Sequence, residues 1–251
     1  MNHLFSIITI TKDNPKDFIY TAESIICQTY KNYEWIVIDS SQNNTARQIV
    51  KNYEKNIDLL YFSEARGIAN AWNIGIKKAN GKFIFILNSG DSYEKYFLQN
   101  YKSFISQDQD YIYCSNVKTL YPSRKKIKSK FPAKPWALWR GMHIAHCSIC
   151  MPKLMYDKYG YYPEIEDAMD FALFAKIFKL EGEKIFKIIP VRSYALYTLG
   201  GHSELNYFKG LNATKKINIK NGMNPFLANI MASIYKIKFI IFKIKDSILK
   251  K

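Results

Sequence analysis

Short β-branched or aromatic segments alternate with amphipathic segments through the first hundred residues, and this alternation constrains the fold more than any other feature. The strand-like runs cover residues 5–10, 34–39, 59–62 and 82–87, and the helix-like stretches cover residues 17–28, 45–56 and 67–80. Strands separated by helices of about 10–15 residues form βαβ units around a mostly parallel sheet. We therefore predict an α/β fold, with a Rossmann-like sheet flanked by helices.

Polar side chains follow the predicted strands where the chain leaves them. Thr9 and Thr11 close the first run, Asp39 closes the second, and Asn-Ser-Gly-Asp at residues 88–91 follows the fourth. Ligands of parallel sheets bind at this edge, outside the carboxyl ends of the strands. Neither a G-x-G-x-x-G nor a G-x-x-x-x-G-K-[ST] motif follows the first run, which argues against a dinucleotide enzyme and a P-loop ATPase.

The second half of the chain is less regular than the first. The patterns there predict two strands and one helix, over residues 110–114, 143–151 and 166–180. With 251 residues, 48% of them hydrophobic, the chain can bury a sizeable core. We expect one α/β domain made of residues 1–100 and 101–204, followed by a basic helical tail over residues 205–251.

The formal net charge of +16 is concentrated in two segments. Residues 111–156 contain nine Lys or Arg and no acidic residue, and residues 205–251 contain ten Lys and one acidic residue, Asp246. Such segregation indicates an anionic partner or surface near these segments. A lysine-rich composition that maintains solubility is the alternative explanation.

The end of the tail, residues 234–251, mixes Ile and Phe with lysines every few positions. We predict an amphipathic helix that lies on an anionic membrane, where each lysine contributes about 1 kcal/mol to binding. The lysines interrupt the apolar sequence, so this helix cannot span the bilayer. No run of 18 or more uncharged apolar residues occurs, so no transmembrane helix is expected. A helix packed on the protein's own core is the alternative.

The four cysteines are too few and too scattered for a secreted disulfide scaffold. The first ten residues also lack the basic and apolar regions of a signal peptide, so we expect a reducing, cytoplasmic setting. Cys147 and Cys150 lie near His143 and His146, but no second cysteine pair completes a zinc site.

Three segments together resemble the family-two glycosyltransferases, which have the GT-A fold. They are residues 6–11, residues 35–41 and residues 67–91, and the Asn-Ser-Gly-Asp run is similar to that of a bacterial colanic-acid and capsule subgroup. The resemblance implies an inverting hexosyl- or N-acetylhexosaminyltransferase that uses a nucleotide-sugar, in particular a UDP-sugar. The implied acceptor is a glycan or a polyprenyl-diphosphate-linked saccharide for capsule, exopolysaccharide or lipopolysaccharide, on the inner face of the bacterial cytoplasmic membrane.

The same resemblance assigns the donor-binding residues in the first part of the chain. Asp39 matches the carboxylate that accepts a hydrogen bond from the nucleotide base, which favours a base with an N–H group, such as uracil or guanine. Arg66 stands where the subgroup has an acidic residue, and it either contacts phosphate or is solvated. The other implied donor-binding residues are Thr9, Asn73, Asn88, Ser89 and His146.

The resemblance places Asp91 at a divalent metal, Mn²⁺ or Mg²⁺, which takes oxygen ligands. Asn88 and Gly90 occupy two positions where the family has further Asp residues, so a single carboxylate would hold the ion. The alternative is that Asp91 caps a turn.

An inverting transfer needs a base for the acceptor hydroxyl, and the family supplies an acid at the start of a helix in its second half. Matching the apolar residues selects Asp170 first, while a Glu-Asp pattern selects Glu166 or Asp167, and we rank Asp167 second. The alternative is that these acids have no catalytic role and lie in the first helical turn because the helix dipole stabilises negative charge there. His146 precedes this helix and could equally be a core histidine.

Two other functions compete with a glycosyltransferase. A basic nucleic-acid-binding protein would explain the charge but not the polar strand ends, so we expect no nucleic-acid partner. A catalytically weak GT-A-like binding or scaffold protein would explain the single carboxylate in the Asn-Ser-Gly-Asp loop.

Overall fold

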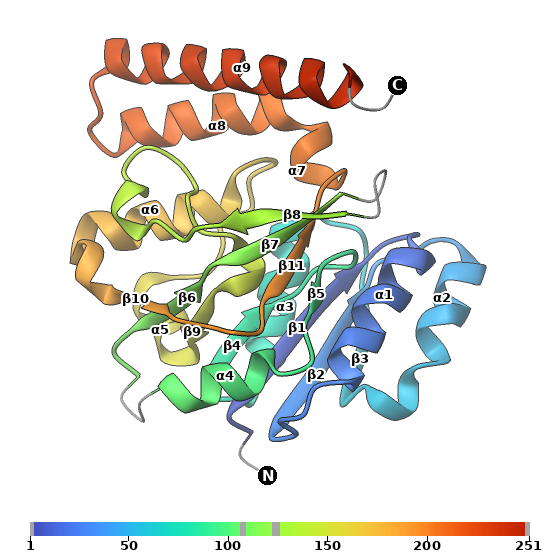
Figure 1. Cartoon of the computed structure of the whole chain (residues 1–251). Helices are drawn as coiled ribbons and strands as arrows, with labels where there is room; N and C mark the ends of the chain where they lie inside the picture. Colours follow the sequence, from blue (N-terminus) through green and yellow to red (C-terminus); the bar gives the residue numbers. More distant parts are fainter. Residues whose placement is uncertain (1–2, 106–108, 122–125, 249–251) are drawn as a thin grey trace.

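The computed structural model describes residues 3–105, 109–121 and 126–248 and contains a seven-stranded central sheet (Figure 1). The strand order is β10-β6-β9-β4-β1-β2-β3. The bounds are β1 Phe5–Thr11, β2 Tyr33–Asp39, β3 Leu59–Phe62, β4 Phe83–Ile86, β6 Ile112–Ser115, β9 Cys150–Pro152 and β10 Phe186–Ile189. Only β9 runs antiparallel to its neighbours, β4 and β6, and the other pairs in this sheet are parallel.

Helices cover both faces of this sheet, so its strands are apolar on both sides, as parallel strands are. Residues of α1 (Pro15–Ile26), α2 (Asn44–Lys51) and α4 (Phe97–Phe104) share one core cluster. Residues of α3 (Ile68–Lys78), α5 (Lys153–Tyr159) and α6 (Met169–Glu181) share the other. Successive strand residues alternate between the two clusters, as Ile7 and Ile8 do in β1.

Local sequence explains where two of these helices sit. The Asn43 side chain accepts hydrogen bonds from the backbone N–H groups of Thr45 and Ala46, which caps the start of α2. A Cβ atom at Gly75 would come within 2.4 Å of the Ile8 side chain. Glycine at that position therefore lets α3 approach β1 closely.

A second, four-stranded sheet lies across the carboxyl edge of the first, in the order β5-β11-β7-β8. Its strands are β5 Ser92–Tyr93, β7 Val117–Tyr121, β8 Lys126–Phe131 and β11 Ala195–Thr198. Because β5 directly follows residues 88–91, β11 is brought next to that loop. Short 3-10 turns occupy Glu54–Asn56, Pro135–Ala137, His146–Ser148 and Glu183–Ile185.

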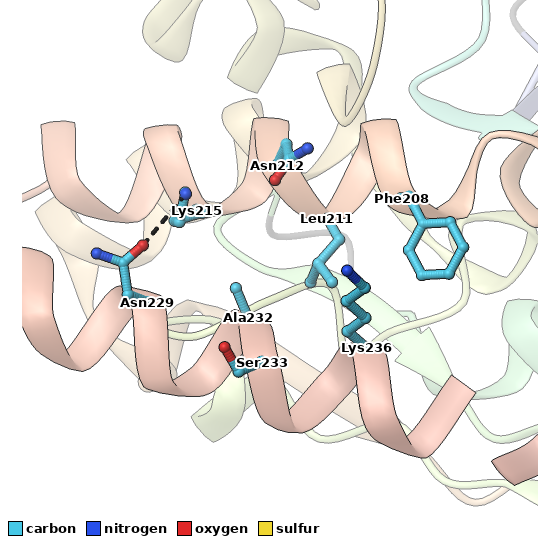
Figure 2. Close-up of a pocket in the computed structure, with 8 residues that line it drawn as sticks. All are labelled: Phe208, Leu211, Asn212, Lys215, Asn229, Ala232, Ser233 and Lys236. Atoms are coloured by element: carbon cyan, nitrogen blue, oxygen red, sulfur yellow. Dashed lines mark hydrogen bonds between the residues drawn. The ribbon is translucent and has the colours of Figure 1, made fainter. Parts of the chain in front are cut away.

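The chain ends in α7 (His202–Leu205), α8 (Tyr207–Lys220) and α9 (Pro225–Ile248), and α9 is the outermost element (Figure 1). The rings of Tyr207 and Phe239 stack at 3.8 Å and join the two long helices. A cavity of about 320 Å³ lies between them (Figure 2), where Lys215 Nζ donates to Asn229 Oδ1 at 3.2 Å. All its lining residues belong to α8 and α9, so it is separate from the predicted donor site.

The outer face of α9 carries an apolar stripe that the protein leaves exposed. Its members follow one another at intervals of three or four residues, so they share one side of the helix. They are Phe226, Ile230, Ile234, Ile237, Ile241 and Ile244. Phe226 alone is 75% exposed, and the stripe runs along most of the helix.

The central α/β prediction is confirmed, and three local expectations are wrong. Residues 143–151 form a strand only from Cys150, because His146–Ser148 makes a 3-10 turn. The helix expected from residue 166 begins at Met169, because Ala168 has a left-handed backbone with φ of 58°. The helix expected over residues 45–56 ends at Lys51.

The expectation that the tail does not cross a membrane stays a prediction. The segment Pro225–Ile244 is long and apolar enough, with a mean hydropathy of 1.4, to cross a membrane by length and composition alone. The first half of this helix, residues 225–235, is uncharged, and its lysines begin at Lys236. Only 6% of this apolar stretch is buried against the rest of the protein.

Candidate active site

The loop of residues 88–91 is fastened from two sides at the carboxyl end of β4. Thr21 of α1 donates through Oγ1 to the Asp91 carbonyl at 2.7 Å and accepts from the Gly90 N–H at 2.9 Å. Thr198 of β11 donates its backbone N–H to Asp91 Oδ1 at 2.9 Å and its hydroxyl to the Gly90 carbonyl. Gly90 has φ of +100°, a backbone that glycine adopts without strain. The Asp91 carboxyl is therefore held in a fixed position.

The electrostatic environment of Asp91 disfavours its ionised form. Burial raises the pKa of the Asp91 carboxyl to about 7; the Thr198 N–H lowers it, and the Asp17 charge raises it. A cation beside this carboxyl would favour the ionised form by offsetting those penalties. The Asp17 carboxylate is next to Gly90, where an added Cβ would lie 3.4 Å from its Oδ2, and its charge acts on Asp91. Both carboxylates offer the oxygen donors that Mg²⁺ and Mn²⁺ prefer. The residues present thus fit a divalent ion.

The sheet end beside this loop holds Asp39, which is fully buried. Its Oδ1 accepts the backbone N–H of Ser41 at 2.8 Å, while Oδ2 is buried and has no hydrogen-bond partner among the described residues. An unpaired buried carboxylate oxygen is unfavourable unless a ligand supplies a donor. Asp13 fixes the neighbouring loop, because its Oδ1 accepts the N–H groups of Gln42 and Asn43 at 2.8 and 2.7 Å.

Two further predicted donor residues lie in the loop after β4. Ser89 Oγ is also buried without a partner in the described part of the chain. Asn88 Oδ1 accepts the indole N–H of Trp72 at 2.8 Å. Asp39 and Ser89 are thus polar groups that the protein leaves unsatisfied at one edge of the sheet.

Three other predicted donor residues have their polar atoms occupied. Thr9 Oγ1 accepts the Trp35 indole N–H at 3.0 Å, and the amide of Asn73 bonds both the N–H and the carbonyl of Tyr162. Arg66 is exposed and pairs with Glu64 at 2.7 Å. Among the described residues, these side chains have other hydrogen-bond or ion-pair partners than Asp39 and Asp91, so their roles in donor binding stay predictions.

His146 lies in an aromatic cluster that reaches the predicted site. Its Nε2 is 2.8 Å from the Tyr162 hydroxyl, and its ring centroid is 4.6 Å from that of Trp72. Burial lowers the pKa of the His146 imidazole to about 4, although the Asp170 charge acts in the opposite direction. The side chain is therefore a neutral hydrogen-bonding group near pH 7.

The two predicted bases lie at the start of α6 but in different surroundings. Asp170 is in the first turn, and its charge acts on both His146 and the Tyr162 hydroxyl. Asp167 lies 3.9 Å from the His202 imidazole. Glu166 contacts Lys209 at 3.6 Å and is exposed. Asp170 is therefore the acid that joins the His146 cluster.

Sequence reasoning missed Tyr197 of β11. Burial raises the pKa of its hydroxyl, and the charges of Asp91 and Asp170 add to that effect, so Tyr197 is near both acids. The next residue in β11, Thr198, donates its backbone N–H to the Asp91 carboxyl. No motif in the sequence signals these two residues, because only the pairing of β11 with β5 brings them to the loop.

The cysteines do not form a metal site. Cys114, Cys147 and Cys150 are free and buried, and Cys27 is free and exposed. Across residues 3–105, 109–121 and 126–248, no three His, Cys, Asp or Glu side chains group closely enough to hold an ion by themselves. A metal at Asp91 would therefore take further oxygen ligands from a bound diphosphate or from water.

Comparison with known proteins identifies the family. The model of glycosyl transferase family 2 matches residues 6–155. The chain belongs to this family. The parallel-rich central sheet agrees with this assignment. The solved structures that resemble this chain are GT-A glycosyltransferases.

The relatives of this family-2 glycosyltransferase act in bacteria. It is 30% identical over 227 residues, 86% of this chain and 88% of the relative, to an Escherichia coli enzyme, WfaP, named UDP-Glc:alpha-D-GlcNAc-diphosphoundecaprenol beta-1,3-glucosyltransferase. It is 31% identical over 108 residues, 41% of this chain and 42% of the relative, to the putative teichuronic acid biosynthesis glycosyltransferase TuaG of Bacillus subtilis.

Solved structures share the fold at low identity. TarS 1–349 of S. aureus in complex with UDP-GlcNAc aligns with a TM-score of 0.65 and 18% identity, over 92% of this chain and 70% of that one. The chain spans 42% of a longer TarS structure. The mannosyltransferase PcManGT of Pyrobaculum calidifontis, solved with GDP-Man and Mn²⁺, aligns with a TM-score of 0.66 and 15% identity, over 94% of this chain and 70% of that one.

Proposed function

We propose that this family-2 glycosyltransferase transfers a hexosyl or N-acetylhexosaminyl group, with inversion, from a UDP-sugar to a lipid-linked saccharide. The observation that carries the proposal is the buried, unpartnered Oδ2 of Asp39 at the carboxyl end of β2. The N3–H of uracil is a donor of the kind that this oxygen lacks. WfaP is named for a UDP-Glc donor, and TarS was solved with UDP-GlcNAc, which supports the choice of UDP.

The loop after β4 receives the diphosphate in this proposal. Asp91 would hold a Mn²⁺ or Mg²⁺ ion, which would neutralise the charge that develops on the leaving diphosphate. The Ser89 hydroxyl is free to donate to the same group. Thr9, Asn73, Asn88 and Arg66 complete the donor site, with Arg66 released from Glu64 to contact phosphate.

Asp170 is the proposed base, with Asp167 second. The acceptor hydroxyl oxygen forms a bond to C1 of the sugar while the bond from C1 to the diphosphate oxygen breaks. The hydroxyl proton goes to the Asp170 carboxylate, and the nucleoside diphosphate leaves with the bonding electron pair. Neutral His146 and the Tyr162 hydroxyl, 2.8 Å apart, orient groups on this side of the site.

The proposed acceptor is a sugar on a polyprenyl diphosphate, used to build a surface polysaccharide. Residues 1–100 bind the donor, residues 101–204 bind the acceptor, and residues 205–251 meet the anionic inner face of the bacterial cytoplasmic membrane. The exposed apolar stripe on α9 supports this assignment. WfaP is named for a diphosphoundecaprenol acceptor, and TuaG for teichuronic acid biosynthesis.

The α9 stripe also separates this proposal from a nucleic-acid-binding protein. A nucleic acid would be met by cations and would leave an apolar face uncovered, whereas an interfacial helix buries its apolar face and keeps its lysines at the headgroups. We therefore propose a membrane surface and no nucleic acid as the partner of the tail.

A thermal-shift screen tests the donor assignment. The protein is melted with UDP, GDP, UDP-glucose and UDP-GlcNAc, each with and without Mn²⁺, beside Asp39→Asn as the matched control. A ligand at 100 times its Kd stabilises by about 2.7 kcal/mol, so we expect a clear rise in Tm with UDP and Mn²⁺ that Asp39→Asn reduces. Absence of any shift across these compounds would falsify the proposal.

A further inference from the structure

A second group of polar side chains lies where the segment of residues 132–146 meets α9. The Lys134 N–H donates to the His143 carbonyl at 2.9 Å, which folds the segment back on itself. His143 Nε2 lies 3.2 Å from the Tyr235 hydroxyl of α9, and Lys238 Nζ lies 5.8 Å from the Tyr235 ring. We call Lys134, Arg140 and Lys238, gathered around His143, the basic cluster.

The cations of the basic cluster are not paired with acids in the part of the chain that the structure describes. Burial and the charges of Arg140, Lys134 and Lys238 lower the pKa of the His143 imidazole to about 4. Three cations near a neutral imidazole repel one another unless an anion lies between them.

Two exposed tryptophans border the basic cluster. The Arg140 guanidinium carbon lies 5.2 Å from the Trp136 ring centroid and 5.9 Å from that of Trp139. Both rings are almost half exposed, at 47% and 46%. Arg140 Nε is buried and has no hydrogen-bond partner among the described residues. The aromatic rings thus hold in place a guanidinium whose Nε–H is not used by the described residues.

The basic cluster adjoins the apolar stripe of α9. Lys238 lies four residues after Ile234 of the stripe, so the two are neighbours on the helix surface. Tyr235 lies three residues before Lys238 and faces the segment of residues 132–146 through its bond to His143. An anion in the cluster would therefore lie beside an apolar path along α9.

We propose that the basic cluster binds the diphosphate of the lipid-linked acceptor, with Arg140, Lys134 and Lys238 as the cations that contact it and the lipid chain running along the α9 stripe into the bilayer. Arg matches phosphate oxygens through a planar set of donors, and Lys acts as a point charge. Tryptophan favours the boundary between water and lipid, where this diphosphate lies. The inference rests on the proposed lipid-linked acceptor and adds the residues that read its diphosphate.

The test measures binding directly, so it does not depend on transfer. Full-length protein with saturating UDP and Mn²⁺, which block the donor site, is titrated with farnesyl diphosphate, farnesol or pyrophosphate. Acrylamide quenching of tryptophan reports binding, because Trp136 and Trp139 are exposed. We expect protection by farnesyl diphosphate at concentrations at least tenfold below those of farnesol or pyrophosphate.

Two double variants compare the basic cluster with other exposed lysines of α8 and α9. Arg140→Gln with Lys238→Gln removes two cluster cations, and we expect Kd for farnesyl diphosphate to rise at least tenfold, which corresponds to about 1.4 kcal/mol. Lys216→Gln with Lys236→Gln removes the same charge from other exposed positions of α8 and α9 and should leave this Kd within twofold. Lys134→Gln with Lys238→Gln keeps Arg140 and its stacking, so it repeats the test if the first variant is unstable.

Each outcome decides the proposal. Equal Kd values in the cluster and control variants overturn it. So does a cluster variant that loses binding to phosphatidylglycerol vesicles while binding farnesyl diphosphate normally, because the cluster would then contact only membrane headgroups. UDP binding is measured in the same samples, so loss of the proposed donor function is seen separately from loss of this site.

Discussion

The carboxyl edge of the central sheet and the α8–α9 hairpin are built in opposite ways. At the edge, polar atoms are buried and fastened by neighbours, as Asp91 is by Thr21 and Thr198. On the hairpin, apolar side chains are exposed and lysines surround them. A fixed polar edge suits a small charged ligand, and an exposed apolar face suits an extended surface. The first three of the following predictions alter one region while the other serves as the control, and the fourth concerns the stability of the whole protein.

The largest effect is expected for the proposed base. Asp170→Asn keeps the size of the side chain but cannot take up the acceptor proton, so we expect kcat to fall about 10³-fold. The Kd for UDP, measured by titration calorimetry, should be unchanged, and binding to vesicles should be unchanged too. Asp167→Asn is the matched control and should lose far less activity. An Asp170→Asn enzyme with full turnover would remove the base assignment.

The next effect concerns donor recognition. In Asp39→Asn the carboxylate that pairs with a base N–H is lost, and a hydrogen bond to a charged group contributes about 1.5–3 kcal/mol. We expect the Kd for UDP to rise about 30-fold while vesicle binding stays as in the wild type. Isothermal titration checks the first quantity and sedimentation with vesicles the second. Unchanged UDP affinity would show that Asp39 does not contact the base.

A smaller effect is expected on the hairpin. Ile237→Gln with Ile241→Gln interrupts the apolar stripe, and because burial of each side chain contributes about 1.5–3 kcal/mol at most, we expect at least tenfold weaker binding to anionic vesicles. UDP affinity should not change. Ile188→Gln, at an isoleucine of β10 that is 50% exposed, is the control. Vesicle binding that survives the double change would argue against the stripe as the membrane contact.

The smallest effect is on the pH dependence of stability. The pKa values of the His143 and His146 imidazoles are lowered to about 4, mainly by burial. The unfolded chain takes up these protons near pH 6.5, so stability from both groups is present above pH 6.5 and is lost as the pH falls toward 4. Asp91 has the opposite effect, because its pKa is raised to about 7 in the folded protein. Its ionisation destabilises the folded state above pH 7, and this penalty is lost as the pH falls toward 4.

A variant isolates the histidine contribution. Gln at position 143 can still bond the Tyr235 hydroxyl but does not titrate, so His143→Gln should lose about 3 °C less Tm than the wild type between pH 7 and pH 5. Differential scanning calorimetry measures both melting curves. Parallel changes in the two proteins would mean that His143 titrates normally.

The sequence allowed the sheet edge to be predicted because it depends on local patterns. Strand periodicity and the polar residues after each strand locate Asp39 and Asp91 without any knowledge of long-range pairing. Tyr197 and Thr198 could not be predicted, because β11 reaches Asp91 only through its pairing with β5, about a hundred residues away in the chain. Asn73 was expected at the donor, and its amide bonds Tyr162 because α3 packs against a loop that no pattern predicts.

For the α8–α9 hairpin, the sequence pattern predicts a basic helical tail, and the structure contains these helices. The pattern does not predict which side of α9 is exposed. Which side of a helix faces outward depends on what covers the other side. Here the stacking of Tyr207 on Phe239 decides that.

The distribution of thiols gives the molecule a built-in attachment point. Cys27, which ends α1, is exposed, whereas Cys114, Cys147 and Cys150 are buried, and burial raises the pKa of the Cys114 thiol to about 12. A maleimide dye should therefore react with a single position on the native chain. Energy transfer from that dye to acceptors dissolved in a vesicle would report how far the end of α1 stands from the lipid, and hence which way the enzyme faces.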